Sequence, residues 1–115
     1  MKRILTLAAI CAAGTMAFAA ADDSILQRQS HMKEVGAAAK ARDLAALATA
    51  GEAALVAFQT DTSGQGTVKT KAADNIWTDW DGFEEIMNTM ITSAKAGDAD
   101  GVFATCKTCH STYRN

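Results

Sequence analysis

The 115-residue chain contains no proline, although average usage would give roughly six. Because proline interrupts helices, its absence favours long, uninterrupted ones. Aromatic residues make up only 6% of the chain, and 11 Lys and Arg residues nearly balance 13 Asp and Glu residues. Without a basic surplus, the chain lacks the electrostatic signature of a nucleic-acid-binding protein. With 49% apolar residues and abundant alanine and leucine, the composition predicts one ordered, all-α domain.

Residues 1–21 have the three parts of a secretory signal peptide. Lys2 and Arg3 form a positively charged start, an apolar stretch follows, and small residues permit cleavage after Ala19 or Ala21. The alternative is a transmembrane anchor, but the apolar stretch is short for a bilayer and a cleavage site follows it. We therefore expect export to the periplasm and no stable membrane anchor after cleavage.

Cleavage leaves residues 22–115 as the functional domain and, by removing Lys2 and Arg3, takes the formal charge from −2 to −4. Cys11 is lost with the leader, so the exported protein has two cysteines, Cys106 and Cys109. Two remaining thiols in an oxidising compartment require an explanation, either as a disulfide or as ligands to another group.

Hydrophobic periodicity predicts four amphipathic helices. The first is expected to begin at Ser24, where Gln27 completes a capping box. Asp43 is expected to cap the second helix, whose apolar stripe contains Gly51 at a point of close helix approach. The inward side of the last two helices is predicted to carry Ile76, Trp80, Phe83, Met87, Met90, Ala94, Val102, Phe103, Cys106, Cys109, His110 and Tyr113.

The connections between these helices predict their arrangement. Residues Thr60–Lys71 are polar and contain glycine, which indicates a loop. The third helix is expected over Ala73–Ala96, and Gly97 and Asp98 form a short connection to the fourth. Short first and third connections favour antiparallel neighbours, hence an up-down-up-down four-helix bundle.

Cys106-Lys107-Thr108-Cys109-His110 is a C-x-x-C-H motif, the signature of covalent haem c attachment. On a helix the two cysteines and the histidine lie on one face, where two thiols can join the vinyl groups of one porphyrin and the imidazole can reach its iron. A structural zinc site needs four ligands, and His31 is the only further histidine. A thioredoxin-like motif belongs beside a strand, and a plain disulfide leaves His110 unexplained. One covalent haem c is therefore the predicted cofactor.

The chain resembles the class II c-type cytochromes, the cytochrome c-prime family, over nearly all of its exported part. The resemblance is carried by the terminal CKTCHSTYR, the AGD before the last helix, NIW in the third and RQSHM in the first. It implies a four-helix bundle in which Cys106 and Cys109 are thioether links and His110 is the proximal iron ligand. It also implies Arg28 near a haem propionate and Met32 at the distal position, while Arg114 matches the family's basic residue after the histidine.

Helix geometry is compatible with this distal position for Met32. If the first and last helices are antiparallel, Ser24 lies near the level of Asn115. Met32 then lies about 12 Å along the first helix, and His110 about 7.5 Å in from the end of the last. The two levels differ by less than one turn, so Met32 can overlie a haem held by His110.

Three aromatic residues, Phe58, Trp77 and Trp80, are expected at the same end of the bundle, as walls of the haem pocket or simply as bundle core. Arg28 has a plainer alternative as a solvated surface charge. Met87 and Met90 lie about 20 Å or more along the third helix and are expected to fill the core. His31 points about a quarter turn away from Met32 and is expected on the surface.

Two functions are open. If the Met32 sulfur binds iron opposite His110, a six-coordinate haem suits a one-electron carrier that works with a redox partner protein. If Met32 only covers the distal face, the iron is five-coordinate and binds NO or CO. A third reading is a helical interaction module with an accidental motif. No catalytic constellation is present, so we do not expect an enzyme. The chain is shorter than typical family members, which puts their usual homodimer contact through the first two helices in doubt.

Overall fold

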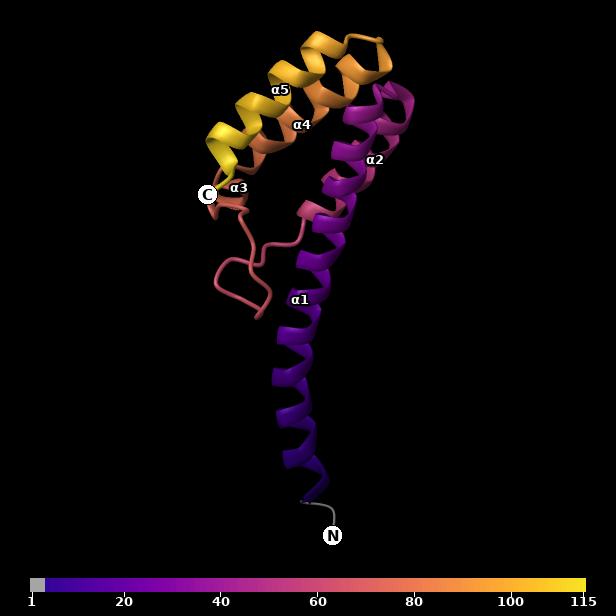
Figure 1. Ribbon diagram of the computed structural model, residues 1–115. Coiled ribbons are helices and arrows are strands. Elements are labelled where there is room, and N and C mark those ends of the chain that lie inside the picture. Colours follow the sequence, from indigo (N-terminus) through magenta and orange to yellow (C-terminus); the bar gives the residue numbers. More distant parts are fainter. Residues whose placement is uncertain (1–3) are drawn as a thin grey trace.

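A computed structural model describes the backbone of residues 4–115 and the side chains of residues 19–115. Its helices are α1 (Ile4–Ala41), α2 (Leu44–Phe58), α3 (Asn75–Thr78), α4 (Trp80–Lys95) and α5 (Ala99–Tyr113). Figure 1 shows the four long helices running alternately up and down, with the long connection between α2 and α3 at one end. In this part of the chain the one β contact is an isolated bridge between Ala72 and Arg114. The predicted all-α four-helix bundle is confirmed.

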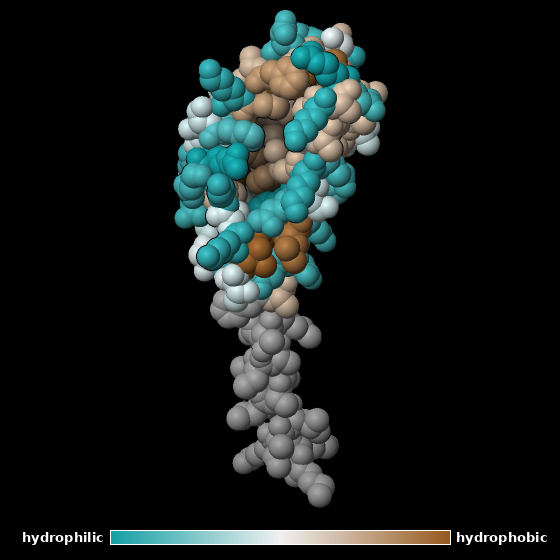
Figure 2. Space-filling model, viewed as in Figure 1, coloured by the Kyte–Doolittle hydropathy of each residue, from teal (hydrophilic) through white to brown (hydrophobic). Residues whose placement is uncertain are grey.

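The helices pack in chain order, α1 on α2, α2 on α4 and α4 on α5. By contrast, α1 and α5 do not pack extensively on one another. Figure 2 shows a hollow on this face, between α5 on one side and α1 on the other, with hydrophilic side chains at its rim and paler, more apolar ones inside. The first and last helices are therefore separated at the place where the sequence analysis puts a cofactor.

The predicted helix caps are present at both short connections. The Asp43 carboxylate accepts a hydrogen bond from the Ala46 amide at 3.1 Å, and the Asp98 carboxylate accepts one from Gly101 at 2.9 Å. Gly97 has a φ of 74°, a left-handed conformation that glycine adopts without strain. These local signals end and restart the helices where the sequence predicts.

The predicted start of the first helix is wrong. Ser24 lies inside α1, which runs without a break from Ile4, so Ser24 and Gln27 form no capping box. The residues before Ser24 are strong helix formers without proline, and the helical hydrogen bonds therefore continue through both expected cleavage positions. The positive start of the expected signal peptide lies in residues 1–3, outside the described residues. No helix in the described part is both long and apolar enough to cross a membrane.

The predicted continuous helix over Ala73–Ala96 is also wrong, because the helix is interrupted at Asp79. Asp79 has φ −123° and ψ 51°, and it separates α3 from α4. Its carboxylate accepts a hydrogen bond from the Tyr113 hydroxyl at 2.6 Å. This bond joins residues 34 positions apart, and helix periodicity carries no signal for it.

Gly82→Ala is expected to break the bond between Tyr113 and Asp79. A Cβ at Gly82 would lie 2.6 Å from the Tyr113 hydroxyl and 2.5 Å from an Asp79 carboxylate oxygen. Chiefly through that hydrogen bond, and also through burial, the pKa of Tyr113 is raised from 10.0 to about 12. We expect the variant to lower this pKa toward 10, measured by ultraviolet titration of the chain's single tyrosine.

The sign of the accompanying stability change follows from linkage. A raised folded-state pKa stabilises the fold below pH 10 and loses that contribution as the pH rises through about 12. The difference in unfolding free energy between wild type and Gly82→Ala should therefore be largest below pH 10 and should disappear above pH 12. Gly36→Ala, where a Cβ meets nothing within 4 Å, is the control. An unaltered tyrosine titration in Gly82→Ala would contradict the role given to this bond.

The core between the helices is filled mainly by aliphatic residues, methionine and one aromatic cluster. The Phe83 ring centre lies 5.0 Å from Phe58, 5.5 Å from Trp80 and 5.4 Å from Tyr113. Other fully packed residues are Leu47, Ala54, Ile76, Met87, Met90 and Val102. The predicted burial of Met87 and Met90 is confirmed, and so is close approach at Gly51, where a Cβ would lie 3.0 Å from Met90 Cε.

The prediction that Phe103 faces inward from the last helix is wrong. Its side chain is 41% exposed, and the Arg42 guanidinium lies over its ring at 5.5 Å. Val102, its neighbour, is fully buried. Since adjacent helical residues point about 100° apart, only one of the two can face the core, and Val102 occupies that position.

Candidate haem site

Cys106, Cys109 and His110 lie on α5, in the turns before its C-terminal end. Both thiols are free and only partly buried. Cys106 Sγ lies 3.7 Å from Met90 Sδ, so this thiol faces α4. Burial raises the pKa of Cys106, while burial and the neighbouring Cys106 raise the pKa of Cys109 to about 11. At neutral pH both sulfurs are therefore uncharged thiols.

The His110 side chain remains accessible on the surface of α5. Partial desolvation, with a smaller contribution from the charge of Arg114, lowers the pKa of His110 below 6.5. The imidazole is consequently neutral at pH 7, which is the form that binds a metal. The three residues of the motif thus offer two thiols and one ligating nitrogen within two turns of one helix.

Arg28 is buried, with 1% of its surface exposed, and it is not the solvated charge that was its plainer alternative. Its guanidinium donates to Thr62 Oγ1 at 2.7 Å and to Thr70 Oγ1 at 3.3 Å. It lies over the rings of Trp77 at 5.1 Å and Phe58 at 5.6 Å. Among the described residues no carboxylate pairs with it, and burial lowers the pKa of Arg28.

The predicted aromatic residues divide into two groups. Trp77 and Phe58 adjoin Arg28, and Trp77 Nε1 donates to the Phe58 carbonyl at 2.7 Å. The Trp80 ring centre instead lies 5.5 Å from that of Phe83, and the Arg28 guanidinium lies over Phe58 and Trp77 and not over Trp80. Phe58 and Trp77 thus lie beside the Arg28 guanidinium, while Phe58 and Trp80 both pack on Phe83. The role of the three rings as walls of a haem pocket stays a prediction.

Met32 is partly buried against the core, one helical turn beyond Arg28 on α1. Two hydrogen bonds of the long connection link this part of α1 to the end of α5. Gln29 Nε2 donates to the Lys69 carbonyl at 2.9 Å, and the Asn115 amide donates to the Lys71 carbonyl at 2.7 Å. Gln29 and Asn115 are thus bonded to residues two apart on the same segment, which ties this part of α1 to the end of α5.

His31 lies outside this arrangement. Its side chain is 32% exposed, and its Nδ1 atom, itself covered, lies 3.7 Å from the Glu34 carboxylate. Over the residues that the structure describes, no cluster of three or more metal-ligating side chains is found. The alternative of a zinc site with His31 as a ligand gains no support from these positions.

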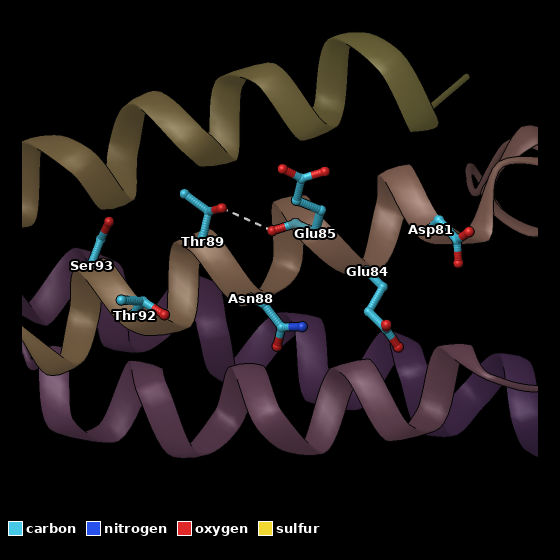
Figure 3. A pocket seen from close by; sticks show the side chains of 7 residues that line it. All are labelled: Asp81, Glu84, Glu85, Asn88, Thr89, Thr92 and Ser93. Atoms are coloured by element: carbon cyan, nitrogen blue, oxygen red, sulfur yellow. Dashed lines mark hydrogen bonds between the residues drawn. The ribbon is translucent and has the colours of Figure 1, made fainter.

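A second hollow lies on the outer face of α4, lined by polar residues (Asp81, Glu84, Glu85, Asn88, Thr89, Thr92 and Ser93). Figure 3 shows that Glu84 and Glu85 project to opposite sides of the helix and that Thr89 bonds to the Glu85 backbone. Because their carboxylates do not converge, they do not form an acid–base pair.

Three observations show that the residues present fit a covalent haem. The two free thiols and the neutral imidazole share one face of α5, α1 and α5 are separated by a hollow, and Arg28 is a buried cation without an anionic partner among the described residues. A buried unpaired charge is costly, and a carboxylate at the edge of a haem would relieve that cost.

Sequence reasoning missed Thr62, Thr70 and Met90 as neighbours of these residues. Thr62 is 4% exposed although it lies in a polar segment that the sequence describes only as a loop. Met90 was expected only to fill the core, yet its sulfur lies 3.7 Å from that of Cys106. No local signal could have found these contacts, because each one joins separate elements.

The bundle and the attachment motif together define a c-type haem protein of the four-helix class. Comparison with known proteins gives a match to the family model of cytochrome C' over residues 15–114. The chain belongs to this family, and it accordingly binds one covalently attached haem c.

Solved structures share the fold. Cytochrome c' from Rubrivivax gelatinosus is 22% identical, with a TM-score of 0.57 over 81% of this chain and 95% of that one. A mutant of cytochrome c prime from Alcaligenes xylosoxidans in complex with nitric oxide is 24% identical, with a TM-score of 0.53 over 83% and 96%. No curated protein sequence matches the chain.

Proposed function

We propose that the protein is an exported, periplasmic electron carrier whose iron is held between His110 and Met32. The single observation that supports this proposal is that Gln29, three residues before Met32, and Asn115, five residues after His110, bond to the same segment. The haem supplies reversible one-electron transfer when bound, and a histidine–methionine pair favours its reduced state. No organic substrate is transformed, so the protein is not an enzyme under this proposal.

Each residue of the chain has a limited task in this proposal. Cys106 and Cys109 would hold the haem through thioether bonds, each adding its S–H across one vinyl group, with the sulfur on one carbon and the hydrogen on the other. His110 would bind the iron through the lone pair of its neutral ring. Arg28 would face a propionate, and its position is held by the Phe58 and Trp77 rings, while Trp80 packs on Phe83, which packs on Phe58.

The location and the partners of the protein are part of the proposal. The charged start, apolar stretch and small residues of the first 21 positions support export, after which the leader is removed. A redox partner protein must then supply or accept the electron. Two copies of the chain could form a homodimer, and the exposed Leu26 and Val56 on α1 and α2 supply apolar surface for it. Nothing in the charge balance supports binding to nucleic acid.

The second candidate function is the binding of NO or CO at a five-coordinate iron. It is favoured by the relative from Alcaligenes xylosoxidans that was solved in complex with nitric oxide. It is also compatible with Met32 covering the distal face through its side chain without donating its sulfur. The two candidates use the same proximal residues and differ only in what Met32 does.

Met32→Ala separates the two candidates. If the sulfur binds iron, the oxidised wild-type protein shows the methionine-to-iron charge-transfer band, and the variant loses it and becomes high-spin. The variant should also have a lower reduction potential and bind CO faster. Visible spectra of both redox states, with and without CO, make the measurement.

Met87→Leu is the matched control, since Met87 is a buried methionine of the core and should leave every spectrum unchanged. High-spin bands and ready CO binding in the wild-type protein would overturn methionine ligation and establish the second candidate.

A further inference from the structure

The long connection between α2 and α3, residues 59–74, is bonded to the lower part of α1, and we call this segment the strap. The Asp22 carboxylate on α1 accepts three hydrogen bonds from it, from the Thr67 amide at 2.6 Å, the Thr67 hydroxyl at 2.8 Å and the Val68 amide at 2.9 Å. The pKa of Asp22 is lowered by these bonds, the two backbone amides contributing most. The strap is thus fastened to the start of the exported helix by one carboxylate.

The strap turns closely around this carboxylate. Gly66 has a φ of 78°, and a Cβ there would lie 2.6 Å from Asp22 Oδ1 and 3.4 Å from Ile25 Cδ1. A left-handed glycine therefore lets two successive amides point at Asp22. Such a local arrangement indicates a specific attachment and not a chance contact of a loop with a helix.

A second attachment lies at Arg28, six residues or about 1.7 turns further along α1. The Arg28 guanidinium binds the strap through Thr62 and Thr70, and the Thr62 hydroxyl is itself buried. Gln29 adds a bond to the Lys69 carbonyl. Asp22, Arg28 and Gln29 are thus the three residues through which α1 binds the strap.

The other side of the strap is bonded to the end of α5. The Asn115 amide donates to the Lys71 carbonyl at 2.7 Å, and the Ala73 amide donates to the Tyr113 carbonyl at 2.9 Å. Figure 1 shows the segment crossing between α1 and the C-terminal end of α5. Because α1 and α5 do not pack extensively on each other, the strap is the direct link between them at this end.

We propose that the strap is a positioning element that sets the spacing between α1 and α5, and through it the access of small ligands to the distal face of the haem. This role of the strap rests on the proposed placement of Met32 opposite His110, because these residues lie on the two helices that the strap joins. Asp22 and Thr62 are positioning residues: they touch neither the iron ligands nor the attachment cysteines, and they act through the strap.

The experiment compares Asp22→Asn and Thr62→Val with wild type as reduced holoprotein. Hydrogen exchange at the Thr67 and Val68 amides reports whether the strap is released, and the association rate of CO reports access to the distal face. Both variants should bind CO about fivefold faster. The loss of about one net hydrogen bond shifts the equilibrium between a bound and a released strap by that factor. Thr62→Ser, which retains the hydroxyl, should restore the wild-type rate.

Asp61→Asn is the matched control, because Asp61 accepts a bond only from Ser63 within the strap and should leave CO binding unchanged. Faster amide exchange with an unaltered CO rate would overturn the proposal, since the strap would then be structural only. Unaltered amide exchange in Asp22→Asn would overturn it as well, because Asp22 would not hold the strap. A wild-type protein that exchanges no electrons, but whose variants bind CO faster, would refute the electron-carrier function and leave the strap's role standing.

Discussion

Replacement of both Cys106 and Cys109 by serine is expected to yield a protein with no covalently bound haem. The two thiols are free, uncharged at neutral pH and on one face of α5, and the third cysteine, Cys11, lies in the expected signal peptide. A serine hydroxyl does not add to a vinyl group under these conditions, so the denatured protein should show no haem-stained band on a gel. Intact mass should lack the whole mass of the haem.

The effect should extend to folding. A hollow separates α1 from α5, and the buried Arg28 has no carboxylate partner, so the protein without haem loses both apolar contacts and a counter-ion. We expect the double variant to have a lower melting temperature and faster proteolysis than the holoprotein.

Cys11→Ser is the control, because Cys11 lies in the expected signal peptide. Single replacements at position 106 or 109 should retain haem through one thioether. A haem-stained band from the double variant would disprove attachment at these two residues.

Phe83→Ala is expected to cost about 3–5 kcal/mol of unfolding free energy, the usual loss for a fully packed phenylalanine. Phe83 is 2% exposed, and its ring contacts Phe58, Trp80 and Tyr113, which come from three other positions around the core. Its removal leaves a cavity that these rigid rings fill poorly. For a domain of this size the melting temperature should fall by roughly 15–30 °C.

Guanidinium denaturation of the holoprotein measures this loss, with Val56→Ala as the control. Val56 is 66% exposed, so its truncation should change the unfolding free energy by less than about 0.5 kcal/mol. A loss near that of the Val56 control would show that the aromatic cluster is not a centre of stability.

The predictable part of the fold depended on signals that are local in the chain. Asp43, Gly97 and Asp98 act within one helical turn, and each of them ends or starts a helix where predicted. The leader is different, because it is built from helix formers, and the helix passes through the predicted start at Ser24. The interruption at Asp79 has no local signal either, since the residue that bonds to Asp79, Tyr113, lies near the far end of the chain.

The candidate site divides in the same way. The spacing of Cys106, Cys109 and His110 is a property of one helix and needs no partner to be recognised. The surroundings of Arg28 are not of this kind, because its burial depends on Thr62, Thr70 and two rings from other segments. A polar segment such as the strap carries no hydrophobic period, so its path across α1 cannot be predicted from its composition.

The sequence by itself therefore determined the helical class, the number of long helices, the attachment motif and the haem it carries, because periodicity, caps and motif spacing each act over a few residues. Only the tertiary structure decided that Arg28 is a buried cation, that Met90 contacts Cys106, that the helix breaks at Asp79 and that a strap links α1 to α5. These features arise where side chains far apart in sequence compete for the same hydrogen bonds and the same buried space. That competition is settled only when the helices pack.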